Sequence, residues 1–131
     1  MAYPLNKEKT LKTIALIAHD GKKPEMIEFV RQYKHVLKKF HLVGTGTTGG
    51  LIREEVGLEV EQMLSGPIGG DVQIAARVVE GKISAVIFFV DQLERHPHDP
   101  DIQTLLRLCN VHNVPLATNP ATARLIIYGD L

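Results

Sequence analysis

Residues 13–18 read Thr-Ile-Ala-Leu-Ile-Ala, and they run directly into the polar segment His19-Asp20-Gly21-Lys22-Lys23. A continuous apolar run of this length is typical of a strand that is buried on both faces of a parallel sheet. Residues 85–90 (AVIFFV) form the strongest strand signal in the chain. The two runs predict strands of a parallel sheet, and the first is expected to have helices on both sides.

Outward from these strands, the chain alternates between strand-like and helix-like segments. Further strands are predicted at residues 42–43, 59–64 and 114–117. The first helix is predicted after Pro24, where Met26, Ile27, Val30, Tyr33 and Leu37 follow at helical spacing. The second is predicted over 48–55, and the third from Asp71 to a stop at Gly81. The fourth begins at Asp99-Pro100 and carries Leu105, Leu106 and Cys109, and the last covers residues 120–128. This alternation predicts a single-domain, doubly wound, three-layer α/β fold with a mainly parallel five-stranded sheet, similar to Rossmann folds. The domain is expected to span residues 1–131, with residues 1–12 as an N-terminal extension.

The composition is that of an ordinary globular protein: 44% of the 131 residues are apolar and 23% are charged. Lys plus Arg and Asp plus Glu both number 15, and this balance disfavours nucleic acid as a partner. The apolar runs are shorter than the roughly 18 residues that a membrane span needs, so no membrane partner and a cytoplasmic location are expected. The single Cys109 is expected to be a buried free thiol.

Polar or glycine-rich segments follow the predicted strands. Besides residues 19–23, they are Thr45-Gly46-Thr47-Thr48-Gly49-Gly50, Ser65-Gly66-Pro67-Ile68-Gly69-Gly70-Asp71 and His96-Pro97-His98-Asp99-Pro100-Asp101. In an open parallel sheet such loops emerge at the carboxyl ends of the strands, where ligands bind. The sequence therefore predicts a small enzyme that acts on a compact anionic substrate such as a phosphate ester.

The glycine-rich segment 44–49 formally matches the G-x-G-x-x-G pattern of dinucleotide-binding proteins. It follows the second predicted strand rather than the first, and the Walker A lysine is absent, so a nucleotide- or NAD-binding domain is disfavoured. Glycines that expose backbone amides, a helix N-terminus and the hydroxyls of Thr45, Thr47 and Thr48 suit an anion. A tight turn that is capped by a threonine explains the same residues equally well.

The carboxylates of these loops also have simpler explanations. Asp71 and Asp99 each stand at a predicted helix start, where an aspartate commonly serves as the N-cap. Asp20 could pair with a neighbouring lysine as surface charge. Asp91 ends an apolar strand, where a carboxylate is costlier and so more suggestive of function.

The segment His96-Pro97-His98-Asp99-Pro100-Asp101 contains residue types that bind metals. Its two prolines stiffen it and Asp99 is already explained as a cap, so a metal site is disfavoured. The remaining histidines, His35, His41 and His112, fall on predicted helices or at their ends and are expected to be solvated.

Taken together, these segments resemble the methylglyoxal synthase family from about Thr13 to Ile127. The matching stretches are Ala18-His19-Asp20, Lys23, Thr45-Gly46-Thr47-Thr48-Gly49, Leu64-Ser65-Gly66-Pro67, Gly69-Gly70-Asp71, Phe88-Phe89, Asp91, Pro97-His98-Asp99-Pro100-Asp101, Leu105-Leu106-Arg107, Ala117-Thr118-Asn119 and Ala121-Thr122-Ala123. Several such blocks in the same order make the resemblance specific. Two positions depart from it: Gln92 stands where the family pattern has proline, and Arg124 where it has an acid.

The resemblance implies a cytosolic lyase that converts dihydroxyacetone phosphate to methylglyoxal and inorganic phosphate. It implies a homohexamer with no metal or organic cofactor, in which phosphate is both product and inhibitor. The family usually continues beyond the position of Leu131 with a segment that reaches a neighbouring subunit, so weaker cooperativity of phosphate inhibition is expected here. The alternative is a non-catalytic phosphate- or nucleotide-sensing module of the same fold.

The resemblance also assigns roles to single residues. Asp71 would abstract the proton, and His98 would polarise the carbonyl and move protons between the enediol oxygens. Asp101, Asp20 and Asp91 would orient groups or act as secondary acid–base residues. Substrate and phosphate would be held by His19, Lys23, Thr45, Thr47, Thr48, Ser65, His98 and the backbone at Gly46 and Gly66. A sensing module would not need Asp71, His98 and Asp101 together, and this favours the enzyme.

Overall fold

The computed structural model describes residues 11–93 and 102–131, and it has a five-stranded parallel sheet at its centre. The strand order is β3-β2-β1-β4-β5, and the strands are β1 (Thr13–Ala18), β2 (His41–Gly44), β3 (Glu61–Gln62), β4 (Ala85–Phe89) and β5 (Leu116–Ala117). All four strand pairs are parallel. The predicted α/β fold with a mainly parallel five-stranded sheet is therefore confirmed.

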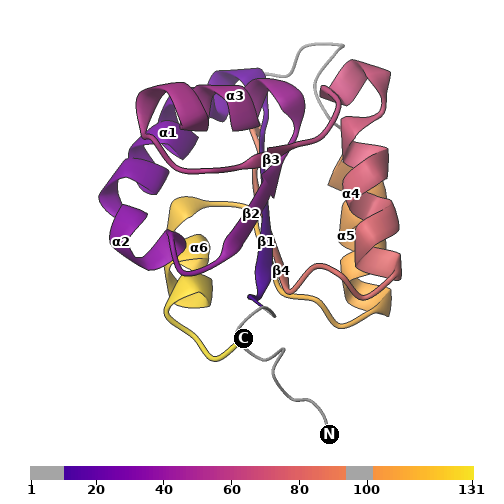
Figure 1. Ribbon diagram of the computed structural model, residues 1–131. Helices are drawn as coiled ribbons and strands as arrows, with labels where there is room; N and C mark the ends of the chain where they lie inside the picture. The colour runs from indigo at the N-terminus through magenta and orange to yellow at the C-terminus, as the bar shows by residue number, and fades with distance from the viewer. Residues whose placement is uncertain (1–10, 94–101) are drawn as a thin grey trace, which may run out of the picture.

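Helices cover both faces of the sheet, as the alternating pattern predicts (Figure 1). One layer holds α1 (Lys23–Gln32), α2 (Lys34–Leu37), α3 (Gly46–Glu55) and α6 (Pro120–Ile127), and the opposite layer holds α4 (Gly70–Val79) and α5 (Ile102–Val111). Two short 3-10 helices, η2 (Asp20–Lys22) and η3 (Gly66–Ile68), follow the ends of strands. Because every strand runs in the same direction, all the strand-to-helix connections lie on the side of the sheet where the strands have their carboxyl ends.

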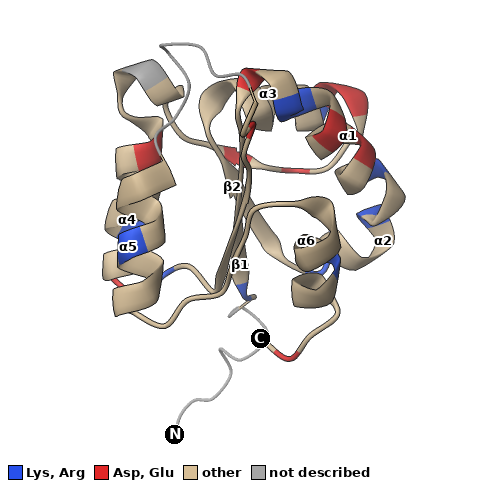
Figure 2. Ribbon diagram, turned by 180° about the vertical axis from the view of Figure 1, so that it is seen from behind, with Lys and Arg blue, Asp and Glu red and all other residues tan. Residues whose placement is uncertain are grey.

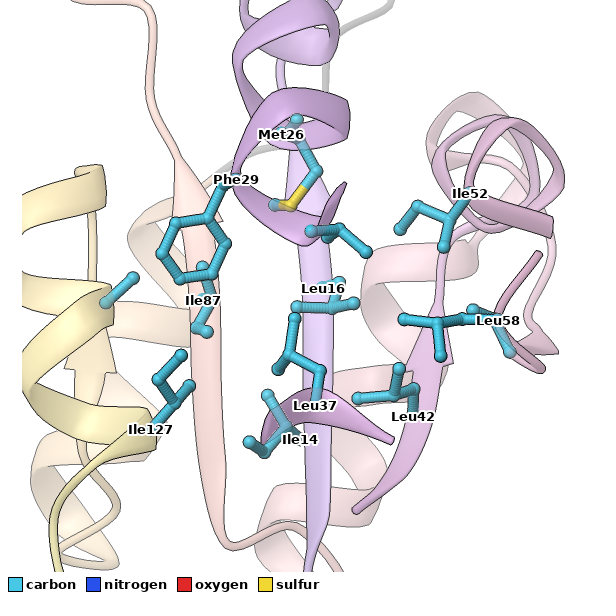
Figure 3. Close-up of a cluster of buried hydrophobic side chains, with 14 of the residues drawn as sticks. Ile14, Leu16, Met26, Phe29, Leu37, Leu42, Ile52, Leu58, Ile87 and Ile127 are labelled. Atoms are coloured by element: carbon cyan, nitrogen blue, oxygen red, sulfur yellow. The ribbon is translucent and has the colours of Figure 1, made fainter. Parts of the chain in front are cut away.

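The central strand β1 buries side chains on both faces. Ile14 and Leu16 pack into the cluster under α1, α2, α3 and α6, whereas Ala15 and Ile17 pack into the cluster under α4 and α5. Figure 3 shows the first cluster, in which Phe29 of α1 and residues of α3 and α6 meet the sheet. This two-sided burial is the physical reason why residues 14–18 are apolar throughout.

The first helical segment is interrupted, although its apolar spacing predicts one continuous helix. Pro24 stands in the first turn of α1, whose buried residues include Met26 and Val30. The backbone leaves helical geometry at Tyr33 (φ −108°, ψ 24°), and the short α2 then buries Leu37. Because Leu37 packs into the same cluster as Met26, the apolar spacing remains regular across the break.

Three predictions about strands are wrong. The fifth strand is predicted over 114–117, but only Leu116 and Ala117 pair with β4. The third strand is predicted over 59–64, but only Glu61 and Gln62 pair with β2. Burial does alternate here, since Val60 is buried and Glu59 and Glu61 are exposed. The hydrogen-bonded strand is nevertheless shorter than the segment over which burial alternates. His41 is exposed as expected, but it opens strand β2 instead of ending a helix.

Cys109 on α5 is 1% exposed, and burial raises the pKa of its thiol to about 11. This confirms the buried free thiol. Lys, Arg, Asp and Glu residues are interspersed over α1 and α3 (Figure 2). No helix within residues 11–93 and 102–131 is long and apolar enough to cross a membrane.

Candidate active site

The end of β1 carries a buried histidine that is held by β4. The His19 side chain is completely buried, and its ring packs edge-on against Phe88. Its backbone amide donates to the Phe89 carbonyl (3.1 Å), and its Nδ1 accepts a hydrogen bond from the Asp91 amide (2.8 Å). An acceptor at Nδ1 implies a neutral imidazole with its proton on Nε2, so this ring presents an N–H donor from Nε2.

A lysine and two carboxylates lie beside this histidine. Lys23 Nζ is 2.7 Å from Asp20 Oδ1 and 3.2 Å from the Ala18 carbonyl oxygen. Asp91 Oδ1 accepts a hydrogen bond from the Leu93 amide (3.1 Å), and Asp91 Oδ2 lies so close to Gly21 that a Cβ there would overlap it. The half-buried Lys23–Asp20 pair therefore lies beside His19 and Asp91, because the ends of β1 and β4 are adjacent.

The glycine-rich segment after β2 opens α3 with two buried threonines. Thr45 occupies the N-cap position and is 4% exposed, yet its side chain makes no capping hydrogen bond. Thr48, in the first turn, is 1% exposed, and its Oγ1 is buried without a hydrogen-bond partner. Buried hydroxyls in proteins are nearly always hydrogen-bonded, so this one calls for an explanation that a simple capped turn does not provide.

The backbone of the same segment is only partly available to a ligand. The Gly46 amide, expected to face a ligand, donates to the Leu64 carbonyl (3.2 Å). The Gly49 amide closes the first helical bond to the Thr45 carbonyl (2.7 Å). Between them, the amides of Thr47 and Thr48 belong to the first turn of α3, where helix geometry supplies no acceptor. These two amides and the positive end of the helix dipole suit an anion.

Asp71 lies at the start of α4, but it is not the N-cap. The N-cap is Gly69, which has a left-handed backbone (φ 108°), and Asp71 is the second residue of the helix. The segment before it is tightly folded: the Gly70 amide donates to the Ser65 carbonyl (2.9 Å), and Gly70 packs directly against the Leu64 carbonyl. The N-cap explanation of Asp71 is therefore wrong, because Gly69, two residues before it, occupies the N-cap position in a left-handed conformation.

Comparison of this sequence with models of known protein families gives a match that covers most of the chain. The family model described as "MGS-like domain" matches residues 25–118. This chain belongs to the MGS-like domain family.

Individual members of the family cover most of this chain. A protein named methylglyoxal synthase from Clostridium beijerinckii is 60% identical over 87% of this chain and 96% of its own length. One from Thermus thermophilus is 56% identical over 89% of this chain and 93% of its own length. The crystal structure of methylglyoxal synthase from Elizabethkingia anophelis superposes with a TM-score of 0.89 at 45% identity, covering 92% of this chain and 79% of that one.

Two of the expected site residues, His98 and Asp101, lie outside the described residues, as does the predicted cap Asp99. The other expected site residues form two adjoining groups in this MGS-like domain. One group lies at the ends of β1 and β4 and contains His19, Asp20, Lys23 and Asp91. The other lies around the ends of β2 and β3 and contains Thr45, Thr47, Thr48, Ser65, Gly66 and Asp71. The groups adjoin because β1 lies between β2 and β4. Within residues 11–93 and 102–131, no three His, Cys, Asp or Glu side chains are grouped so that they could hold a metal ion.

Two glutamines at the site have no counterpart in the sequence-based expectations. Gln62 Nε2 donates to the Gly46 carbonyl (3.0 Å), and Gln73 Oε1 accepts from the Leu64 amide (2.7 Å). Both residues are exposed and read as ordinary surface polar residues. The sequence carries no signal for these contacts, because they join segments that fold together only in three dimensions.

A separate cleft of about 260 Å³ lies between α1 and α6. It shares no residue with the strand-end groups, and its walls include Phe29, Tyr33 and Arg124. Its remaining charged residues, Glu25 and Glu28, are acidic and would repel a phosphate ester. The strand-end groups are therefore the better candidate site for an anionic substrate.

Proposed function

We propose that this protein is a lyase that converts dihydroxyacetone phosphate to methylglyoxal and inorganic phosphate. The observation that carries the proposal is the 60% identity to a methylglyoxal synthase over 96% of that enzyme's length. The strand-end site supports it, because that site combines a half-buried carboxylate, a lysine and an unpartnered buried hydroxyl at a helix N-terminus.

The reaction needs a base, a stabilised oxyanion and a held leaving group. A base removes a proton from the hydroxymethyl carbon, and the electron pair of that C–H bond forms the C=C bond of an enediolate. The enediolate then expels phosphate by breaking the bond between carbon and the bridging oxygen. The remaining three-carbon enol takes up a proton on its terminal carbon and becomes methylglyoxal. No water is consumed, because the phosphate leaves with its bridging oxygen.

Asp71 is the proposed base. It lies in the first turn of α4, one residue after Gly70, whose amide ties the helix start to the Ser65 carbonyl. A carboxylate fixed on a helix end can remain within reach of the substrate while the phosphate group is held by other elements.

The phosphate group is proposed to bind at the start of α3. The Thr48 hydroxyl is buried and unpartnered, and the amides of Thr47 and Thr48 lie in the first helical turn. Lys23 has three donor hydrogens, two of which are accounted for by Asp20 and the Ala18 carbonyl. A dianion at this place would satisfy the hydroxyl and add charge-assisted hydrogen bonds.

The remaining residues are proposed to act on the enediolate oxygens and on the geometry. His19 presents an Nε2–H donor because its Nδ1 is engaged by the Asp91 amide. Asp20 orients Lys23 through their 2.7 Å contact. His98 is proposed to polarise the carbonyl and shuttle protons, and Asp101 is proposed to act as a secondary acid–base residue. Both roles are supported by the family resemblance of residues 97–101. Ser65 and Gly66 are proposed to line the phosphate side of the site.

The protein is further proposed to work in the cytoplasm as a homohexamer that phosphate inhibits, without a metal or organic cofactor, on the strength of the family resemblance. The non-catalytic alternative has one observation in its favour. This chain is 54% identical to a segment making up 26% of an uncharacterised Synechocystis protein, so MGS-like domains also occur inside longer chains.

The deciding experiment incubates the purified protein with dihydroxyacetone phosphate and measures methylglyoxal and free phosphate. Equal amounts of the two products are expected, and they should accumulate linearly with enzyme concentration. Binding of phosphate without any product would favour the sensing module. Glyceraldehyde 3-phosphate as the product would identify an isomerase instead.

Thr48→Val is expected to weaken inhibition by phosphate about tenfold or more, because it removes a hydrogen bond to a charged group. The same change should leave the melting temperature unchanged or raise it, because it replaces a buried unpartnered hydroxyl with a methyl group of similar size. Inhibition constants and thermal melts of the two proteins check the pair of expectations. Thr48→Ser, which keeps the hydroxyl, is the matched control and should keep most of the phosphate affinity. A Val variant that melts lower but binds phosphate normally would assign Thr48 to the core alone.

A further inference from the structure

We propose that Gln73 is a positioning residue that holds the Leu64–Ser65 segment between the phosphate-binding turn of α3 and the helix that carries Asp71. The proposal rests on the proposed function and extends it to a residue that touches neither substrate nor phosphate. Its role is to keep two parts of the site, which lie on different helices, at a constant separation.

The connection runs through the backbone of Leu64. The Leu64 amide donates to Gln73 Oε1 (2.7 Å), and the Leu64 carbonyl accepts from the Gly46 amide (3.2 Å). One side of this residue is therefore bound to α4 and the other side to the first residue of α3. A short hydrogen-bonded path thus joins Gln73 to the turn that contains Thr47 and Thr48.

Asp71 lies between two anchors on the same helix. One residue before it, Gly70 donates to the Ser65 carbonyl (2.9 Å) and packs on the Leu64 carbonyl. Two residues after it, Gln73 accepts from the Leu64 amide. Both anchors bind the same two-residue segment, so the position of Asp71 relative to that segment is determined from both sides.

A second glutamine braces the other end of this path. Gln62 Nε2 donates to the Gly46 carbonyl (3.0 Å), while Arg53 Nη1 donates to Gln62 Oε1 (2.6 Å). The arginine determines which way the Gln62 amide points, because a guanidinium only donates. Gly46 is consequently held through its amide by Leu64 and through its carbonyl by Gln62.

These hydrogen bonds matter because the segment lies beyond the end of the edge strand. Strand β3 ends at Gln62, and the last sheet-like bond is donated by Met63 to the Gly44 carbonyl (2.7 Å). Leu64 is 47% exposed, so burial of its side chain does not determine its position. The reaction needs the base and the phosphate group in a defined relation, and a misplacement of about 1 Å can lower the rate about a hundredfold.

The test compares Gln73→Met with Gln73→Glu. Methionine has a similar length and shape but only a weakly accepting sulfur, whereas glutamate retains an oxygen acceptor for the Leu64 amide. Gln73→Met is expected to lower kcat about tenfold, an order typical of imperfect positioning. Gln73→Glu is expected to restore kcat to within about twofold of wild type, although its added charge should raise KM for the anionic substrate, less so at higher salt.

The matched control is Arg77→Met on the same helix. Arg77 Nη2 binds Glu61 Oε2 (2.8 Å), so this variant removes another link between α4 and the edge strand without touching Leu64. It is expected to keep kcat within about twofold of wild type, since the link it removes is not on the path.

Three outcomes would overturn the proposal: an unchanged kcat in Gln73→Met, an equal loss of kcat in Gln73→Met and Gln73→Glu, or an equal loss in Arg77→Met. Titration of each protein with inorganic phosphate by calorimetry separates this failure from failure of the proposed function. If wild type makes no methylglyoxal but Gln73→Met binds phosphate severalfold more weakly than Gln73→Glu at high salt, the positioning role stands without the reaction. If the two variants then bind phosphate equally, the positioning role is wrong as well.

Discussion

Asp71→Asn is expected to lower the turnover number by at least about a hundredfold, in line with the usual contribution of a general base. The amide has almost the same size as the carboxylate, but it cannot accept the proton from the hydroxymethyl carbon. Substrate and phosphate should still bind, because the proposed phosphate site is on α3 and Lys23 and not on α4. Initial rates at saturating dihydroxyacetone phosphate measure the loss.

Two further measurements identify the step that is lost. Dihydroxyacetone phosphate deuterated at the hydroxymethyl carbon should also stop exchanging its label with water in Asp71→Asn, because abstraction itself is blocked. Glu25→Gln removes a carboxylate from the same region of another helix, the first turn of α1, and should leave turnover unchanged. If Asp71→Asn retained most of the activity, the base would have to be another carboxylate, with Asp20 and Asp101 as the next candidates.

Gly70→Ala is expected to have the second largest effect, because it damages the junction of α4 with the Leu64–Ser65 segment. The new Cβ would overlap the Leu64 carbonyl, which is backbone and cannot rotate away. The resulting displacement should destabilise the protein by about 1–3 kcal/mol, as overpacking does elsewhere. It should also lower kcat/KM about a hundredfold, because the displaced carbonyl is the acceptor of the Gly46 amide.

Gly81→Ala, at the other end of the same helix, is the control for stability alone. Gly81 has a left-handed backbone (φ 77°) and nothing within 4 Å of an added Cβ. An alanine there should cost about 1–2 kcal/mol through its backbone conformation only. Chemical denaturation and steady-state kinetics of both variants are the measurements. Similar destabilisation is expected in both variants, but only Gly70→Ala should lose activity, whereas normal activity of Gly70→Ala would show that the junction tolerates displacement.

Sequence patterns predicted the strands and most helices because each relies on local spacing. Residues 14–18 and 85–89 are apolar throughout, and both strands lie in the interior of the sheet. The predictions were wrong where a neighbour determined the outcome. Residues 59–64 alternate like a strand, but only two of them pair, because pairing depends on where β2 runs.

The candidate site divides in the same way. Loops after parallel strands converge wherever the sheet forms, so the grouping of His19, Lys23 and Thr48 at one edge could be expected from their order in the chain. Which hydrogen bonds each of these polar groups makes could not be predicted from the sequence. That the Gly46 amide is occupied, that Thr48 Oγ1 is buried without a partner, and that Asp71 is not a cap all depend on distances between segments that are remote in sequence.

The sequence by itself determined the α/β class, the strand-end location of the candidate site and the chemical types present there, because hydrophobic periodicity and residue chemistry are local properties. Only the tertiary structure decided which donors and acceptors are already engaged. Gln62 and Gln73 resemble any exposed glutamine in the sequence, yet each contacts the backbone of a segment that another element supplies. A hydrogen bond depends on a distance of about 3 Å and on direction. Those quantities are set only when the strands, turns and helices pack together.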